Sequence, residues 1–195
     1  TGAFSKGSMQ LAPYSEFGAE YGFVTENRRL RFVQLYDDKG ALNRLILIRE
    51  FRASTDAKER PPLTVEQLLG QWQGTACKAY SEWQPSENYA THSEFKDMGG
   101  GYFQENWSIG DCTLTSKFRR EGNTLHCEDE QRPRKILLLP DGCSIDSPLH
   151  VTHRQSFSVE LAWLVQDNER QRLIRTYNEK GEWISSTHVT EHRLG

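Results

Sequence analysis

Hydrophobic and polar residues alternate along much of the chain, a pattern that is typical of β-strands with one buried face. A clear example is the run of apolar residues at every second position formed by Phe157, Val159, Leu161, Trp163 and Val165. Short groups of glycine, proline, asparagine and aspartate separate such segments and predict tight turns. After residue 70 the pattern predicts short strands over residues 71–80, 88–96, 101–109, 112–119, 123–128, 134–139, 149–153, 157–166, 170–177 and 183–192.

One short helix is predicted before the first of these strands. Thr64 and Gln67 have the spacing of a capping box, in which each side chain bonds the backbone of the other residue. Leu63 and Leu68 have the spacing of a hydrophobic staple, and Gly70 is placed to end the helix. A short helix followed by about ten strands with tight turns predicts an antiparallel up-and-down β-barrel.

The last predicted hairpin has a copy near the N-terminus. Residues 29–52 align without a gap to residues 170–193, at an offset of 141 positions and with seven identities among 24 residues. Both copies place a glycine-containing turn at the same point, in residues 37–40 and 178–181. A duplicated domain explains these matches better than the general likeness of any two hairpins.

The repeat predicts how the chain is divided. Residues 1–52 would be the C-terminal strands of a first, incomplete β-barrel, residues 53–62 a polar linker, and residues 63–195 a complete second barrel with its short helix. From the offset, about 80 residues of the first barrel would precede Thr1. The edge strands within residues 1–52 would then pair with those residues, with the second domain or with another chain.

The start of the second domain resembles the entry of a lipocalin-type (calycin) barrel. There a Gly-x-Trp sequence opens the first strand, and an arginine of the last strand covers the tryptophan. Gly70-Gln71-Trp72 matches this sequence, and Arg193 or Arg172 could provide the arginine. The predicted fold class is therefore all-β, a calycin-like up-and-down barrel preceded by the last strands of a similar barrel.

Composition and charge exclude several classes of protein. The mean hydropathy is −0.73, and no apolar run approaches the roughly 20 residues of a membrane-spanning helix, so no membrane insertion is expected. The net charge of −3 argues against binding dominated by nucleic-acid phosphates. The four cysteines include no Cys-x-x-Cys pair and are expected to be reduced thiols.

No catalytic, cofactor-binding or metal-binding residues are predicted. His188 and His192 would share one strand face, but four residues of strand separate them by roughly 13 Å, too far for one metal ion. The triple glycine at residues 99–101 lies between two predicted strands and not before a helix, so it is no phosphate-binding loop. The chain also lacks a Gly-x-Ser-x-Gly or a His-Glu-x-x-His motif.

The candidate partner-binding residues are arginines that recur on the predicted strands, together with one tryptophan in a predicted loop. They are Arg29, Arg31, Arg49, Arg52, Trp83, Arg170, Arg172 and Arg175. The arginines would suit an acidic protein partner. Cross-strand pairing with Glu20, Glu50, Glu160 and Glu191 would explain them equally well, and the sequence does not separate the two interpretations.

All five tryptophans follow residue 70, which leaves two interpretations open. Aromatic residues at alternating positions most often fill the core of a small barrel. They could instead line a cavity that stacks on a flat ligand, and Trp107 and Trp163 are then expected in the barrel interior.

Several segments resemble a cyanobacterial and chloroplast family of tandem calycin-like barrels, formerly labelled a domain of unknown function, which includes a plant ATP synthase biogenesis factor. The segments are residues 45–52, 60–64, 68–74, 137–142 and 172–184. The resemblance implies two β-barrels and a stromal assembly factor. Such a factor would contact the β and γ subunits of the catalytic head of the chloroplast ATP synthase, and the compartment would be the cytoplasm in a cyanobacterium.

Three functions follow as hypotheses. The first is a non-enzymatic, chaperone-like assembly factor that binds proteins. The alternative is a calycin-type carrier of a small ligand or a bilin pigment, which rests on analogy of fold. An enzyme would need a clustered set of acid and base residues that the sequence does not reveal.

Overall fold

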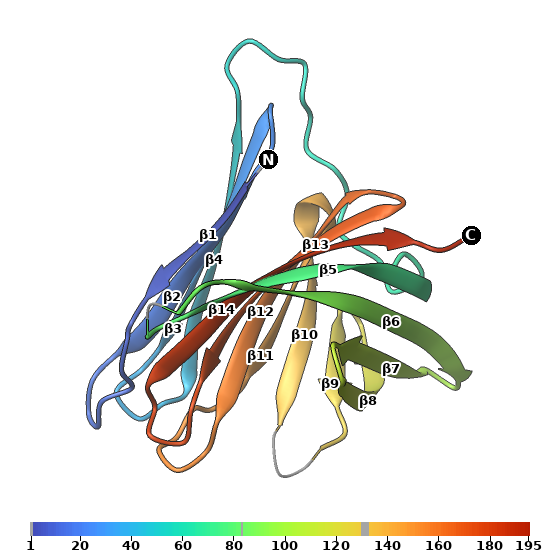
Figure 1. Cartoon of the computed structure of the whole chain (residues 1–195). Helices are drawn as coiled ribbons and strands as arrows, with labels where there is room; N and C mark the ends of the chain where they lie inside the picture. The colour runs from blue at the N-terminus through green and yellow to red at the C-terminus, as the bar shows by residue number, and fades with distance from the viewer. Residues whose placement is uncertain (1, 83, 130–132) are drawn as a thin grey trace.

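The computed structural model describes residues 2–82, 84–129 and 133–195. Within these ranges the chain forms fourteen strands and a single-turn 3-10 helix, η1 (Pro140–Gly142). The strands belong to two antiparallel sheets, one open and one closed (Figure 1). The all-β fold class and the up-and-down antiparallel barrel predicted from the sequence are therefore confirmed.

The open sheet contains the first four strands in chain order, so each strand pairs with its neighbours in sequence. Its strands are β1 (Gly2–Gly7), β2 (Phe17–Val24), β3 (Arg28–Tyr36) and β4 (Leu42–Phe51).

The closed sheet is a ten-stranded barrel. Each strand pairs with the next one in the chain, and β14 pairs with β5 to close the barrel. The strands are β5 (Gly70–Tyr80), β6 (Glu87–Gly99), β7 (Tyr102–Ile109), β8 (Cys112–Glu121), β9 (Thr124–Cys127), β10 (Arg134–Leu139), β11 (Cys143–Pro148), β12 (Phe157–Gln166), β13 (Glu169–Tyr177) and β14 (Trp183–Arg193).

One predicted strand is wrong. The segment 149–153 was expected to be a strand, but the strand at this place is β11, over Cys143–Pro148. Asp141 and Gly142 have positive φ angles of 65° and 72°, so η1 reverses the chain at once and β11 begins immediately after it. Residues 149–151 instead bond the backbone of the open sheet, where Leu42 N donates to Leu149 O (3.0 Å) and Val151 N donates to Gly40 O (2.8 Å).

The predicted short helix is also wrong, although part of its capping chemistry forms. Thr64 N donates to Gln67 Oε1 at 3.0 Å, and Leu68 N donates to Val65 O at 3.0 Å, so the segment makes a turn and not an α-helix. A helix of one turn has little stability of its own. Burial of side chains determines the course of the chain over residues 63–68, because Leu63, Val65 and Leu68 all pack into one end of the barrel.

Trp72 anchors this end of the barrel. Its side chain is fully buried, and its Nε1 donates to Leu68 O at 3.2 Å. The Arg193 guanidinium lies 4.4 Å from the ring centroid and donates to Gln67 O at 2.6 Å. Arg193 is therefore the covering arginine, whereas Arg172 lies elsewhere in the barrel and stacks on Trp107.

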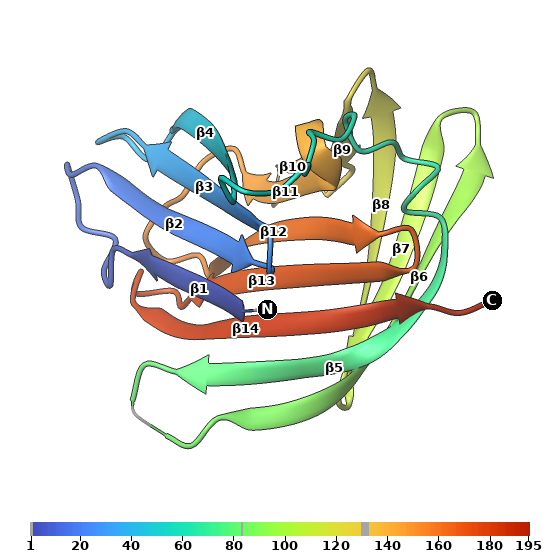
Figure 2. The same ribbon diagram turned by 90° about the horizontal axis from the view of Figure 1, so that it is seen from above.

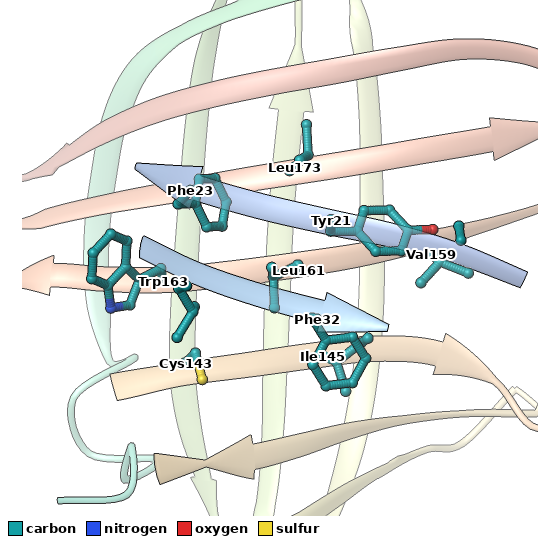
Figure 3. Close-up of a cluster of buried hydrophobic side chains, with 11 residues drawn as sticks. Tyr21, Phe23, Phe32, Cys143, Ile145, Val159, Leu161, Trp163 and Leu173 are labelled. Carbon is teal, nitrogen blue, oxygen red and sulfur yellow. The ribbon is translucent and has the colours of Figure 1, made fainter. Parts of the chain in front are cut away.

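The open sheet packs on the outside of the barrel, over β11, β12 and β13 (Figure 2). Aromatic side chains of β2 and β3 meet outward-facing side chains of the barrel, as the close-up in Figure 3 shows for Tyr21, Phe23, Phe32, Ile145, Leu161 and Trp163. The barrel strands under the sheet are thus covered on their outer faces. Trp163 was expected to face the barrel interior, but it belongs to this outer cluster and stacks on Phe23.

The sequence repeat is also a structural repeat. The pairing of β3 with β4 shifts register between Leu35 and Tyr36, and the pairing of β13 with β14 shifts at the equivalent Thr176 and Tyr177. In the turns that follow, the side chains of the equivalent residues Asp37 and Asn178 accept bonds from the backbone nitrogens two and four residues later.

The two copies also contact each other reciprocally. Tyr36 Oη donates to Pro148 O at 3.0 Å, and its equivalent Tyr177 Oη donates to Ser8 O at 3.0 Å. Because each tyrosine bonds the corresponding carbonyl of the other copy, an approximate two-fold relationship connects the open sheet to β11–β14.

Candidate functional site

The barrel interior has an apolar end and a polar end. At the apolar end, side chains of the strands and of residues 63–68 form one closed hydrophobic cluster. At the polar end lies a cavity of about 560 Å³, which is within the size range of small-molecule sites. Its wall includes five charged side chains and one tryptophan that lie close together, here called the cavity cluster: Glu105, Trp107, Arg134, Asp146, Glu160 and Arg172.

Strand alternation places these charges inside the barrel. On β12, Val159 and Leu161 point outward to the open sheet, so Glu160 between them points into the barrel. The neighbouring β13 likewise points Leu173 outward and Arg172 inward. Val159, Leu161 and Leu173 therefore lie on the covered outer face of these strands, while Glu160 and Arg172 lie inside.

Arg172 is the central cation of the cavity cluster. It is only 5% exposed, and it donates to both oxygens of Glu160, from Nε at 2.7 Å and from Nη2 at 2.8 Å. Its Nη1 lies 3.6 Å from Glu105 Oε1, within ion-pair range but without a hydrogen bond. Its guanidinium also stacks 4.8 Å from the ring centroid of Trp107.

Arg134 and Asp146 form the second ion pair of the cluster, across β10 and β11. Arg134 Nη2 also donates to Ser116 Oγ at 2.7 Å. Burial raises the pKa of Asp146 to about 7, because the loss of hydration outweighs the opposing attraction of Arg134. Glu160 and Glu105 raise it further, whereas Arg172 lowers it.

Below the cavity, Arg170 and Glu191 form a buried ion pair with Nη2 to Oε2 at 2.6 Å. Arg170 also donates to Ser93 Oγ at 2.8 Å and lies 4.6 Å from the ring centroid of Trp72. This pair is balanced in charge and packed between the cavity and the apolar end, so its role is structural.

Three of the arginines proposed for partner binding are not on an outer surface. Arg170 and Arg172 lie inside the barrel, and Arg175 is 2% exposed beneath the N-terminal residues, where Nη1 donates to Ser5 Oγ at 3.2 Å. Their pairing with glutamates, or for Arg175 with Tyr177, accounts for the sequence pattern. The sequence misplaced them because barrel strands under a second sheet are buried on both faces.

The other candidates belong to the open sheet, where Arg29 and Arg31 lie on the face turned away from the barrel. Arg29 binds both oxygens of Glu50 at 2.6 and 2.7 Å, and Arg31 lies 3.4 Å from Glu20. Arg49 stands opposite Leu30, on the barrel-facing side of the sheet, and pairs with Glu59 at 2.9 Å. Arg52 follows directly after β4 and is exposed. Trp83 lies outside the described residues.

Sequence reasoning missed Glu105, Arg134 and Asp146, which complete the cavity cluster. A usable signal was present in β12, where Glu160 interrupts a run of apolar residues in a strand that is otherwise buried. A charge at such a position indicates a polar interior and needs a partner on a neighbouring strand.

The described residues contain neither a metal site nor a membrane-spanning helix. Within residues 2–82, 84–129 and 133–195, no group of three His, Cys, Asp or Glu side chains could hold a metal ion. The same ranges contain no helix that is long and apolar enough to cross a membrane. All four cysteines are free thiols, and Cys143 is buried.

Comparison with known proteins identifies the family. Residues 59–194 match the family model described as biogenesis factor required for ATP synthase 1, C-terminal domain, and residues 1–55 match the N-terminal model of the DUF3598 family, a domain of unknown function. The chain belongs to this family. A crystal structure of a DUF3598 member from the cyanobacterium Nostoc punctiforme is 46% identical, with a TM-score of 0.93, and the match covers 98% of this chain and 72% of that one.

Two other solved structures are much less similar to this member of the DUF3598 family. An S-type phycobiliprotein lyase from Guillardia theta is 12% identical with a TM-score of 0.46, over 67% of this chain and 90% of that one. A protein from Mycobacterium tuberculosis is 13% identical with a TM-score of 0.42, over 67% and 95%. No curated protein matches the chain.

Proposed function

We propose that this protein is a non-enzymatic assembly factor that binds subunits of the catalytic head of ATP synthase, with the β and γ subunits as its partners. The observation that supports this most directly is the match of residues 59–194 to the C-terminal domain of biogenesis factor required for ATP synthase 1. The compartment would be the chloroplast stroma, or the cytoplasm in a cyanobacterium.

The geometry supports action by binding rather than catalysis. Both oxygens of Glu160 are taken up by Arg172, and Asp146 is paired with Arg134. Side chains held in such pairs stabilise a rigid wall and are poorly placed to attack a substrate. The barrel then serves as a scaffold, and contact with protein partners falls to outer faces.

The outward face of the open sheet is the proposed contact surface. Arg29 and Arg31 lie there, and Arg52 is exposed at the end of β4; of these three, only Arg52 has no acidic partner among the ion pairs of the described residues. An acidic surface of a partner subunit would compete for these arginines and accelerate association by electrostatic attraction.

Capture of purified subunits tests this proposal. The immobilised chain is expected to retain the ATP synthase β and γ subunits, and the double variant Arg29→Gln/Arg52→Gln to retain less of them. The matched control is Arg119→Gln/Arg120→Gln, which removes the same charge from β8 of the barrel. Failure of the unmodified chain to retain either subunit, or equal loss in both variants, would contradict the proposal.

The cavity favours a second candidate function, binding of a small ligand. A volume of about 560 Å³ lined by Trp107 and several charged side chains suits a polar ligand with a flat part. Biliverdin, a flat tetrapyrrole, is a coloured probe for it. Binding is expected to shift the visible absorption of biliverdin and quench tryptophan fluorescence, and an unchanged spectrum would exclude a bilin.

A further inference from the structure

The cavity cluster carries one more negative than positive charge. Three carboxylates, those of Glu105, Asp146 and Glu160, face two guanidinium groups, those of Arg134 and Arg172. Elsewhere on the described wall Lys117 adds one positive charge, and Glu128 and Asp129 add two negative charges. The deeper pair of Arg170 and Glu191 is balanced and does not change the excess, although Glu191 Oε1 also lies 3.9 Å from Arg172 Nη1. An uncompensated charge in a poorly hydrated interior is costly, so the cluster favours the arrival of a further cation.

The protonation behaviour of Asp146 agrees with this charge excess. Its pKa is raised to about 7, so near neutral pH the carboxyl group is partly protonated, which reduces the negative charge of the cluster. The groups that act on it come from the surrounding strands, Arg134 of β10, Glu160 of β12, Glu105 of β7 and Arg172 of β13. A bound cation near these carboxylates would displace the proton.

The same wall also contains two hydrogen-bond donors without a partner. They are Trp107 Nε1 and Arg172 Nη1, whose side chains stack on each other. Arg172 is 5% exposed, and its Nη1 makes no hydrogen bond although Glu105 Oε1 and Glu191 Oε1 lie 3.6 and 3.9 Å away; a buried donor without a hydrogen bond is unusual in a folded protein. These donors need an oxygen acceptor, which a ligand in the adjacent cavity can supply.

The geometry of the cavity favours an organic cation over a metal ion. In the part of the chain that the structure describes, the carboxylates of the cluster do not come together as a metal site. A cavity of about 560 Å³ instead has room for an organic molecule that spans several wall residues.

We propose that the cavity binds an organic cation, a guanidinium or alkylammonium compound that also carries a carbonyl or hydroxyl oxygen. The carboxylates of Glu105 and Asp146 hold the cationic group, and Trp107 Nε1 and Arg172 Nη1 donate to the oxygen. The inference rests on the second candidate function, small-ligand binding, and specifies its ligand class. An arginine residue has this chemistry whether it is a free amino-acid derivative or part of a peptide.

Calorimetric titration with two isosteric probes tests the cationic group. N-acetyl-arginine amide carries the guanidinium and carbonyl oxygens, and N-acetyl-citrulline amide has the same shape without the charge. We expect the arginine compound to bind at least about tenfold more tightly, the effect of one charge-assisted hydrogen bond. Agmatine, which keeps the guanidinium but has no carbonyl oxygen, is expected to bind more weakly than N-acetyl-arginine amide. A short arginine-containing peptide is titrated as well, and tighter binding of the peptide than of N-acetyl-arginine amide would indicate that the ligand is part of a peptide and not a free amino-acid derivative.

Variants test whether the cavity cluster is responsible. Asp146→Asn and Glu105→Gln each remove one negative charge with little change of shape, and each is expected to weaken binding of the arginine compound about tenfold. Glu94→Gln is the matched control, because Glu94 lies on β6 and pairs with Lys96 at 2.8 Å and with Gln71. The indole N–H resonance of Trp107, assigned with Trp107→Phe, is expected to shift on binding.

The outcomes separate this inference from the function on which it rests. Equal affinity for the arginine and citrulline compounds, or binding that Asp146→Asn and Glu105→Gln both leave unchanged, would overturn the inference. Binding of biliverdin without binding of the arginine compound would also overturn it, while leaving small-ligand binding intact. If no probe binds at millimolar concentration to correctly folded protein, both the inference and the proposed small-ligand function are overturned.

Discussion

The substitution Asp146→Asn makes the raised pKa of this carboxyl group measurable as a change in stability. The pKa is about 7 in the folded protein and about 3.8 for an unperturbed aspartate. Between those values the folded state holds a proton that the unfolded state has released. Asp146 therefore stabilises the fold at low pH, and this contribution is lost as the pH rises towards 7 and beyond.

The size of this stability change follows from the pH interval over which Asp146 is protonated in the folded state but ionised in the unfolded state. Each pH unit between pH 5 and pH 7 is worth about 1.4 kcal/mol. Wild-type protein is therefore expected to lose about 3 kcal/mol through this group between pH 5 and pH 8.5, a loss that an asparagine cannot show. His188, whose pKa burial lowers, acts in the opposite direction but is common to both proteins.

Urea denaturation of wild type and Asp146→Asn at several pH values measures this difference. The stability of the variant relative to wild type is expected to rise by about 3 kcal/mol from pH 5 to pH 8.5. The exposed Asp111→Asn provides the same chemical change outside the barrel and is expected to shift nothing. A relative stability that is constant across this range would mean that Asp146 is already ionised at pH 5 and would refute the reasoning.

The remaining predictions concern packing and thiol reactivity. Arg193→Ala removes the cover of Trp72 and the bonds to the turn before β5, and is expected to cost about 2–3 kcal/mol in urea denaturation. Gly74→Ala would place a Cβ 1.9 Å from Thr190 O, so we expect a lower melting temperature from the forced separation of β5 and β14. Cys143, whose pKa burial raises to about 12, is expected to stay unmodified in native protein at pH 8, while exposed Cys77 and Cys112 react with iodoacetamide.

Each of these predictions has a control and an outcome that contradicts it. Arg119→Ala on β8 should change stability little, and equal loss for both arginines would show that Arg193 is not special. Gly2→Ala meets no atom within 4 Å and should be neutral. Mass spectrometry of peptides identifies the labelled thiols, and rapid modification of Cys143 would show that the contact between the open sheet and the barrel opens readily.

Local chemistry was enough to predict most of the strands and the structural repeat. The alternation in β12 predicted a strand with the observed bounds, 157–166, because the side-chain period of two is a property of the backbone. The copy at an offset of 141 positions also predicted matching turns, which Asp37 and Asn178 form with equivalent hydrogen bonds. The helix at 64–69 and the strand at 149–153 failed because burial and pairing with the other sheet determine those paths.

Most of the candidate site could not be predicted from the sequence. A strand covered on both faces shows apolar residues outward and charges inward, which is the reverse of what exposure to water would produce. Arg170 and Arg172, which point inward, therefore looked like surface residues, and so did Arg175, which lies on the outer face of β13 beneath the N-terminal residues. Only the tertiary packing shows that all three are buried.

The sequence alone determined that the chain is all-β and that its last hairpin is duplicated. These features depend on neighbours in sequence or on patterns with a fixed period. Only the tertiary structure decided which side of each barrel strand is the interior and which charges meet there. The cavity cluster draws its residues from β7, β10, β11, β12 and β13, and closure of the barrel is the physical event that brings them together.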